Sequence, residues 1–183
     1  ELLKALPGNL GMAYVFVHHL SPDFQSNLTT ILQQHTSMRV EKVVDGLSIE
    51  RDHVYVILPN TFISLEDDRL KVSTRSKLDI PYHPIDYFLI SLAREKESNA
   101  IGIILSGTAT DGTLGLKAIK QSGGITIVQD ESAKHQQMPR NAQEAGYADF
   151  VLSPSLIVKK LTTLMRHPYV SVTAVERHET NAD

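Results

Sequence analysis

The sequence predicts an α/β fold with a doubly wound, mostly parallel sheet, helices on both faces and a small antiparallel hairpin. Short apolar runs of strand length alternate with amphipathic helical segments, which is the pattern of βαβ units. Several of these runs are apolar throughout, as in strands that are buried on both faces of a parallel sheet. Residues 62–65 and 70–73 instead flank an acidic turn, and this arrangement predicts the hairpin.

The first elements are predicted from spacing and from helix signals. Residues 1–6 carry leucines in a short helical segment that stops at Pro7-Gly8, and residues 12–17 form a continuous apolar run. Ser21-Pro22-Asp23 then provides a cap, a proline at the first helical position and an early acid. The apolar residues that follow share one helical face: Phe24, Leu28, Ile31 and Leu32.

Residues 40–44 and 53–58 are predicted strands, and we expect them to join the hairpin as an antiparallel addition. Residues 75–81 are polar and predict a surface loop. The remaining elements follow in order: a helix from Pro84, with Ile85, Phe88, Leu89 and Leu92 on one face, a strand at 101–105, a helix from near Thr113 to Ser122-Gly123-Gly124, a strand at 125–128, a loop at 129–138, a helix at 139–145, a strand at 150–152 and a helix from Ser153-Pro154. Residues 169–183 are polar and aperiodic, and we expect a linker or tail there.

Composition limits the classes of partner. The chain has 183 residues, of which 42% are hydrophobic, enough for one well-buried domain. Its net charge is −3 and it lacks a basic run with interleaved aromatic residues, so nucleic acid is not expected as a partner. No apolar run approaches the roughly 20 residues that a membrane helix needs, which predicts no membrane insertion. The absence of cysteine excludes disulfides and thiolate sites and favours the cytoplasm.

The loop between the strand at 101–105 and the following helix contains the first candidate site residue. The spacing from Gly107 to Gly112 matches a phosphate-binding loop, but Thr113 stands in the place of its lysine and Asp111 would repel a phosphate. A nucleotide cofactor is therefore not predicted. Asp111 has two interpretations: a functional acid, or a cap for the helix that begins near Thr113.

Three polar features are predicted at the carboxyl ends of different strands: His19, Asp111, and Met138-Pro139-Arg140. Ligands and catalytic groups collect at this edge of an open α/β sheet. A histidine and an aspartate so placed are two parts of a hydrolase triad, with the histidine as general base. A metal site is not predicted, because adjacent His18 and His19 point to opposite faces of a strand and the other histidines lack a ligand spacing. His83 is expected at a helix start.

Five motifs together resemble the catalytic domain of the chemotaxis protein-glutamate methylesterases (CheB), over about residues 7–168. They are Val17-His18-His19-Leu20-Ser21-Pro22; Asp52-His53-Val54-Tyr55-Val56 followed by Pro59; His83-Pro84-Ile85-Asp86; Leu105-Ser106-Gly107-Thr108-Ala109-Thr110-Asp111-Gly112; and Met138-Pro139-Arg140-Asn141-Ala142. The resemblance implies hydrolysis of glutamate methyl esters on chemoreceptor helices with release of methanol, and deamidation of particular receptor glutamines.

The resemblance also assigns roles to individual residues. It implies that His19 is the general base and Asp111 the acid that orients it. The backbone of residues 107–110, together with Thr108 and Met138, would line the substrate and oxyanion site, and Arg140 would face a substrate carboxylate or an acidic receptor surface. Surface exposure is an equal alternative for Arg140, as is simple core packing for Met138.

The departures from the family pattern concern the nucleophile. The family's serine lies on a Gly-x-Ser-x-Gly-Gly turn, and the chain has no such sequence. We therefore expect residues 1–168 to be a catalytic domain that lacks its N-terminal strand and serine turn, and this piece to be inactive. Ser21 and Ser106 are better explained as a cap and a turn residue. The Thr108 loop and the exit at 166–168 are more similar to methylesterases fused to a receptor methyltransferase.

The sequence has two alternative interpretations besides a methylesterase. A non-catalytic receptor-binding or scaffolding module could keep the fold without the chemistry. A generic α/β esterase is disfavoured, because its chain order is serine, acid, histidine, whereas His19 precedes Asp111 here.

Overall fold

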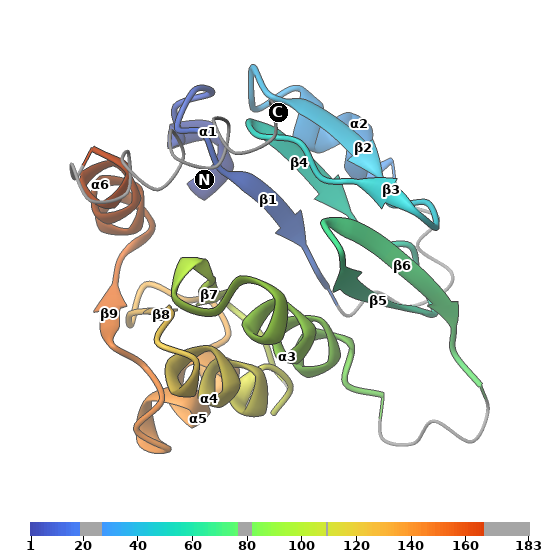
Figure 1. Cartoon of the computed structure of the whole chain (residues 1–183). Helices are drawn as coiled ribbons and strands as arrows, with labels where there is room; N and C mark the ends of the chain where they lie inside the picture. Colours follow the sequence, from blue (N-terminus) through green and yellow to red (C-terminus); the bar gives the residue numbers. More distant parts are fainter. Residues whose placement is uncertain (19–26, 77–81, 109, 167–183) are drawn as a thin grey trace, which may run out of the picture.

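The computed structural model describes residues 1–18, 27–76, 82–108 and 110–166 (Figure 1). Its first half contains α1 (Leu2–Ala5), β1 (Ala13–Phe16), α2 (Leu28–Gln33), β2 (Arg39–Lys42), β3 (Leu47–Ser48), β4 (His53–Val56), β5 (Thr61–Glu66) and β6 (Arg69–Thr74). Its second half contains α3 (Pro84–Lys96), a 3-10 turn at Glu97–Asn99, β7 (Ile101–Ile104), α4 (Thr113–Gln121), β8 (Ile125–Gln129), α5 (Gln137–Glu144), β9 (Phe150–Leu152) and α6 (Pro154–Met165).

The parallel strands form two sheets of three strands each. In one sheet β4 lies between β1 and β2, and in the other β8 lies between β7 and β9. All four pairings are parallel, with Val15 opposite Tyr55 and Ile103 opposite Ile127 as examples of the register. Within the described residues, four strands have a single parallel partner: β1 and β2 pair only with β4, and β7 and β9 pair only with β8, so β1 and β7 are each an open edge of their sheet.

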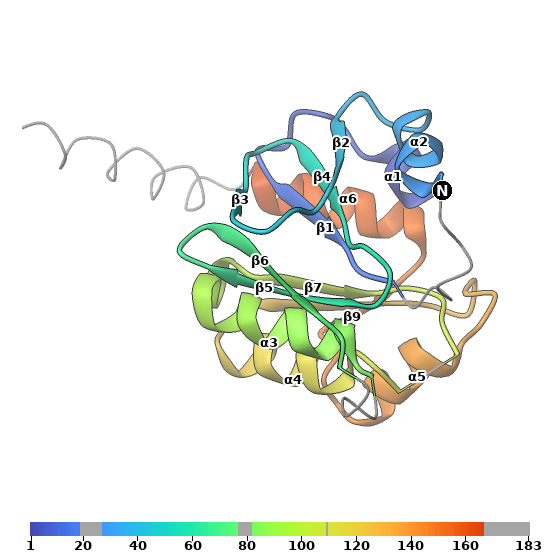
Figure 2. The same cartoon turned by 90° about the vertical axis from the view of Figure 1, so that its right-hand side faces the viewer.

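Both parallel sheets share the same two hydrophobic cores, one on each face. Val54 of β4 and Ile127 of β8 belong to one core, whereas Tyr55 and Val128, the next residue of each strand, belong to the other. Alternation of this kind means that the two sheets act as parts of one layer, covered on both sides. Figure 2 shows α3 and α4 on one side of β7, and α1 and α6 on the other. The expected α/β architecture is therefore confirmed.

The antiparallel sheet contains the predicted hairpin and one additional strand, but that strand is not one of those predicted to join it. β5 and β6 pair as expected around Asp67 and Asp68, which both have positive φ, as a two-residue hairpin turn requires. The short β3 adds a third strand to β6. The prediction that residues 40–44 and 53–58 belong to this addition is wrong, because β2 and β4 are parallel strands of the main layer. α3 packs against β5, where Leu65 N donates to Ser91 Oγ at 3.0 Å.

Most helix predictions agree with the structure to within a few residues. Gly123 and Gly146 end α4 and α5 with φ of 80° and 75°, and the Ser153 side chain accepts from Leu156 N at the start of α6. Two details differ. Met138, expected in a loop, lies inside α5, and Ile31, expected on the apolar face of its helix, is 50% exposed. The predicted start of that helix and the predicted tail at 169–183 fall outside the described residues.

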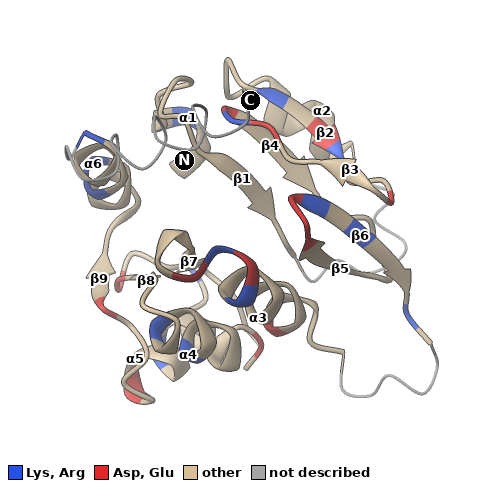
Figure 3. Cartoon of the chain, viewed as in Figure 1, with Lys and Arg blue, Asp and Glu red and all other residues tan. Residues whose placement is uncertain are grey.

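Figure 3 marks charged residues of both signs on α3, whereas β6 and α4 carry basic residues only. None of the helices in the described ranges is long and apolar enough to cross a membrane.

Candidate active site

Asp111 is buried at the junction of two helices. It is 1% exposed and lies in the loop between β7 and α4. Its Oδ2 accepts a hydrogen bond from Ile85 N at 2.9 Å, and its Oδ1 accepts one from Asp86 N at 2.8 Å. Both donors belong to the first turn of α3, where free N–H groups and the helix dipole stabilise negative charge. Asp111 therefore caps α3, which is not the helix that follows it in sequence.

Asp86 makes the reciprocal contact. Its Oδ1 accepts from Gly115 N, in the first turn of α4, at 2.7 Å. The starts of the parallel helices α3 and α4 thus lie together. N–H groups of α3 donate to the Asp111 carboxylate just before α4, and an N–H group of α4 donates to the Asp86 carboxylate of α3. Gly112 makes the turn into α4 with a φ of 94°, and a Cβ there would lie 2.4 Å from Ile104 Cδ1. The turn requires glycine on both counts.

His83 lies beside both carboxylates. Its Nδ1 is 3.7 Å from Asp111 Oδ1, and its side chain is 34% exposed. A cleft of about 340 Å³ opens at this point; it is lined by His83, Asp86, Thr110, Thr113, Leu114 and Asn141. The Thr113 hydroxyl is buried and has no hydrogen-bond partner within the described ranges. The cleft therefore combines a titratable imidazole, hydroxyl groups, an amide and one apolar wall.

Burial raises the pKa of the Asp86 carboxyl, and the charge of Asp111 raises it further. The Gly115 N–H and the nearby His83 oppose this rise, but burial outweighs them. The two carboxyl groups have different partners: Asp111 accepts from the first turn of α3 through both oxygens, whereas Asp86 interacts with the backbone of Gly115 and Gly112 at the start of α4.

The same three side chains could geometrically hold a cation, since one ligand atom from each of His83, Asp86 and Asp111 lies within 4.8 Å of the others. Backbone N–H groups already donate to three of the four carboxylate oxygens. A cation would have to approach oxygens whose lone pairs face these donors, so the geometry favours the helix-capping role. The prediction that no metal is required stays a prediction.

The loop before Asp111 is joined to α5 by a set of backbone contacts. Gly107 N donates to His135 O at 2.9 Å, Met138 N donates to Gly107 O at 3.1 Å, and His135 N donates to Ser106 Oγ at 2.9 Å. Met138 packs directly on Gly107, where a Cβ would lie 2.0 Å from Met138 Sδ. Ser106 is thus a turn residue, as expected. The structure also brings the predicted Met138 motif beside the Asp111 loop.

The other predicted site residues differ in placement. Thr108 and Arg140 are both exposed, and Arg140 Nη2 donates to Gln136 Oε1 at 3.2 Å. His19 lies outside the described residues, so its separation from Asp111 stays untested. Its neighbour His18 follows β1, with its ring centroid 5.7 Å from that of Phe16.

Sequence reasoning did not assign Asp86 and His83 to this site. The signal that could have identified Asp86 is periodic: Asp86, Leu89 and Ala93 share one buried stripe of α3, so an acid sits where the helix is otherwise apolar. A buried acid needs a partner. His83 offers no such signal, because a histidine before a proline is equally common at an exposed helix start.

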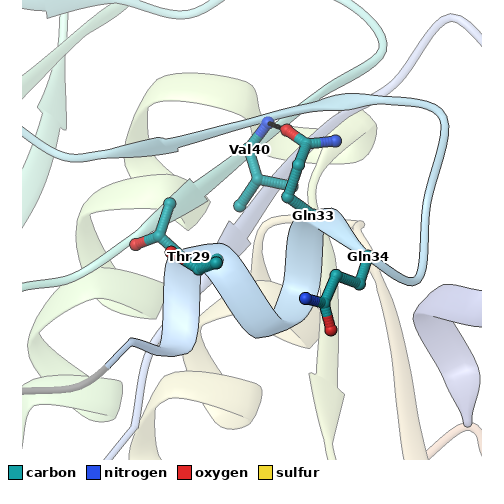
Figure 4. A pocket seen from close by; sticks show the side chains of 5 residues that line it. Thr29, Gln33, Gln34 and Val40 are labelled. Atoms are coloured by element: carbon teal, nitrogen blue, oxygen red, sulfur yellow. Dashed lines mark hydrogen bonds between the residues drawn. The ribbon is translucent and has the colours of Figure 1, made fainter.

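A second cleft, of about 380 Å³, lies between α2 and β2 and is lined by Thr29, Thr30, Gln33, Gln34 and Val40 (Figure 4). Gln33 Oε1 accepts from Val40 N at 3.0 Å, and its Nε2 donates to Met38 O at 2.9 Å. These bonds tie the helix to the edge strand. The Gln33 amide, at least, therefore serves the local structure of this cleft.

Fold and site together define a parallel α/β domain with a buried acid at the carboxyl edge of the sheet. Residues 1–161 match the family model described as CheB methylesterase. The chain belongs to the CheB methylesterase family.

Named relatives and a solved structure agree with this assignment. The chain is 32% identical, over 83% of its length, to a putative protein-glutamate methylesterase/protein-glutamine glutaminase of Leptospira interrogans, of which the match covers 80%. It is 33% identical, over 90% of its length, to the protein-glutamate methylesterase/protein-glutamine glutaminase of Moorella thermoacetica, of which it covers only 40%. The crystal structure of the Thermotoga maritima CheB methylesterase catalytic domain superimposes with a TM-score of 0.81 at 29% identity, covering 88% of each chain.

Proposed function

We propose that this chain is the catalytic domain of a protein-glutamate methylesterase that hydrolyses methylated glutamates on the cytoplasmic helices of chemoreceptors and releases methanol. Deamidation of receptor glutamines is part of the same proposal. The observation that carries it is Asp111, a carboxylate that is 1% exposed, held by two helix N–H donors and set at the carboxyl edge of the sheet. A fixed, buried carboxylate suits the role of an orienting acid in acyl transfer.

In this mechanism His19 acts as the general base. Asp111 selects the tautomer of the His19 imidazole and stabilises the imidazolium that forms when the nucleophile loses its proton. Attack on the ester carbonyl gives an acyl-enzyme and methanol, and water then releases the glutamate. Thr108, Met138 and Arg140 would border the substrate, with backbone N–H groups of the Gly107 loop as oxyanion donors.

The nucleophilic serine belongs to a strand and turn upstream of residue 1. The open edges of β1 and β7 support this part of the proposal, because one more parallel strand between them would join the two sheets into a single layer. A cytoplasmic location and a fused receptor methyltransferase domain are further parts of the proposal.

The test is methanol release from a methylated receptor by the full-length protein that contains this chain. Asn in place of Asp111 keeps the side-chain size but cannot stabilise the imidazolium, so we expect kcat to fall by about 10,000-fold in the Asp111→Asn variant. Residues 1–183 alone should release no methanol. Wild-type kcat in the Asp111→Asn variant would refute the catalytic role and favour a receptor-binding module without chemistry.

A further inference from the structure

Asp86 joins the buried acid to both helix starts. Its backbone N–H donates to Asp111 Oδ1 at 2.8 Å, while its side-chain Oδ1 accepts from Gly115 N at 2.7 Å. Asp111 and Gly115 belong to one short loop-to-helix segment, so the two bonds hold that segment at both of its ends. Asp86 is itself 7% exposed, which leaves its side chain little freedom to move.

We propose that Asp86 is a positioning residue for the methylesterase reaction: its carboxyl oxygen fixes the start of α4 against α3 and thereby holds the Asp111 carboxylate where it must orient His19. This inference rests on the proposed function. The physical reason is geometric, because a displacement of about 1 Å in a catalytic group can cost about 100-fold in rate.

The proposed role depends on where the hydrogen-bond acceptor lies at the start of α4, and not on the charge of the Asp86 carboxyl. Burial raises the pKa of Asp86, and its Oδ1 accepts from Gly115 N in either protonation state. The titratable groups that face it are His83 and Asp111. The effect of the acceptor's position can therefore be separated from the effect of its charge by one substitution that removes only the charge and another that changes only the position.

The experiment compares Asp86→Asn with Asp86→Glu in the full-length protein, by methanol release from a methylated receptor. Asn keeps the acceptor position and removes the charge, so kcat should stay close to wild type. Glu keeps the charge but moves the acceptor by one methylene, so kcat should fall by about 100-fold with KM little changed. Loss of kcat in Asp86→Asn with full kcat in Asp86→Glu would overturn the proposal, because charge would then be what matters.

Two further variants separate positioning from loss of stability. Asp149→Glu is the matched control, because Asp149 also accepts a backbone N–H, from Thr126 at 2.9 Å, but takes no part in the site. It should lower stability and leave kcat unchanged. In an Asp111→Ala background, Asp86→Glu should lower the residual rate no further, since there is no carboxylate left to position. An undiminished 100-fold effect in that background would refute the positioning role.

The same set of variants distinguishes the two proposals. If Asp111→Ala alone leaves kcat unchanged, the proposed function fails. If Asp111→Ala abolishes activity and Asp86→Glu keeps wild-type kcat, only the positioning inference fails.

Discussion

Gly107 shows how one residue sets the shape of the candidate site. A Cβ at this position would lie 2.0 Å from Met138 Sδ and 3.0 Å from Met138 Cγ, so the loop and α5 approach more closely than any other residue type permits. The backbone bonds between Gly107 and residues 135 and 138 depend on this approach.

We expect Gly107→Ala to destabilise the domain by about 1 to 3 kcal/mol, because the new methyl group must push Met138 out of its packing. The measurement is urea unfolding. Met138→Ala, which opens space at the contact, serves as the second arm of a double-mutant cycle. The cost of Gly107→Ala should shrink in that background, and an equal cost in both backgrounds would contradict the steric explanation.

Asp111 marks the limit of prediction for single residues. Local spacing correctly offered a helix cap as one interpretation, but it could only consider the helix that follows in sequence. The observed partners, Ile85 N and Asp86 N, are 26 and 25 residues away along the chain. A contact of that kind depends on how two elements pack, and no pattern within one element contains it.

At the level of elements, β2 and β4 explain the error in strand assignment. The alternation in His53-Val54-Tyr55-Val56 is typical of a strand with one solvated face. Both faces are in fact covered, and Tyr55 is 1% exposed. Its hydroxyl reaches past the strand, accepts from Glu50 N at 2.8 Å and donates to Ser48 O at 3.4 Å. A polar tip satisfied in this way makes a buried strand look amphipathic in sequence.

Asp149 links three elements and gives a pH-dependent prediction. Asp149 directly precedes β9. Its carboxylate accepts hydrogen bonds from Lys120 Nζ at the end of α4 and from both the N–H and the hydroxyl of Thr126 in β8. Burial alone would raise its pKa, but the hydrogen bonds from Lys120 and Thr126 outweigh burial and lower it. A lowered folded-state pKa means that the ionised form stabilises the fold above the unfolded-state pKa.

We therefore expect Asp149→Asn to destabilise the domain by about 2 kcal/mol at neutral pH, where the charge-assisted bonds are intact. The difference from wild type should shrink as pH falls below the unfolded-state pKa of about 3.9, because the unfolded wild-type chain then binds a proton at Asp149 that the folded chain does not bind until lower pH. Urea unfolding of both proteins between pH 7 and pH 3 tests this. A difference that is constant over that range would show that ionisation of Asp149 contributes nothing.

For the whole molecule, the open edges of β1 and β7 are the most consequential feature. β1 and β7 each carry a row of backbone groups that no described strand satisfies, although the sheets on either side share both cores. The class of fold followed from the alternation of apolar runs and helices. The division into two sheets could not be predicted, because sequence periodicity indicates where strands lie but not which strands pair with one another.

The proposed function places one more strand upstream of Glu1, and a chain extended by that strand should have a higher free energy of unfolding. A strand inserted between β1 and β7 would pair on both sides and bury apolar surface against both cores. The measurement is the urea midpoint of the extended chain against residues 1–183. A glycine- and serine-rich extension of equal length is the control. If both extensions give the same midpoint, the strand does not insert there.

The exchange of carboxylates between α3 and α4 also has a consequence for the order in which this chain matures. α3 is synthesised first, but the side chain that accepts from its Ile85 and Asp86 N–H groups is added 26 and 25 residues later, respectively. α4 in turn begins on an acceptor already present in α3. We therefore expect the two helix starts to form as one cooperative unit, which is incomplete until residues 84–115 have all been synthesised.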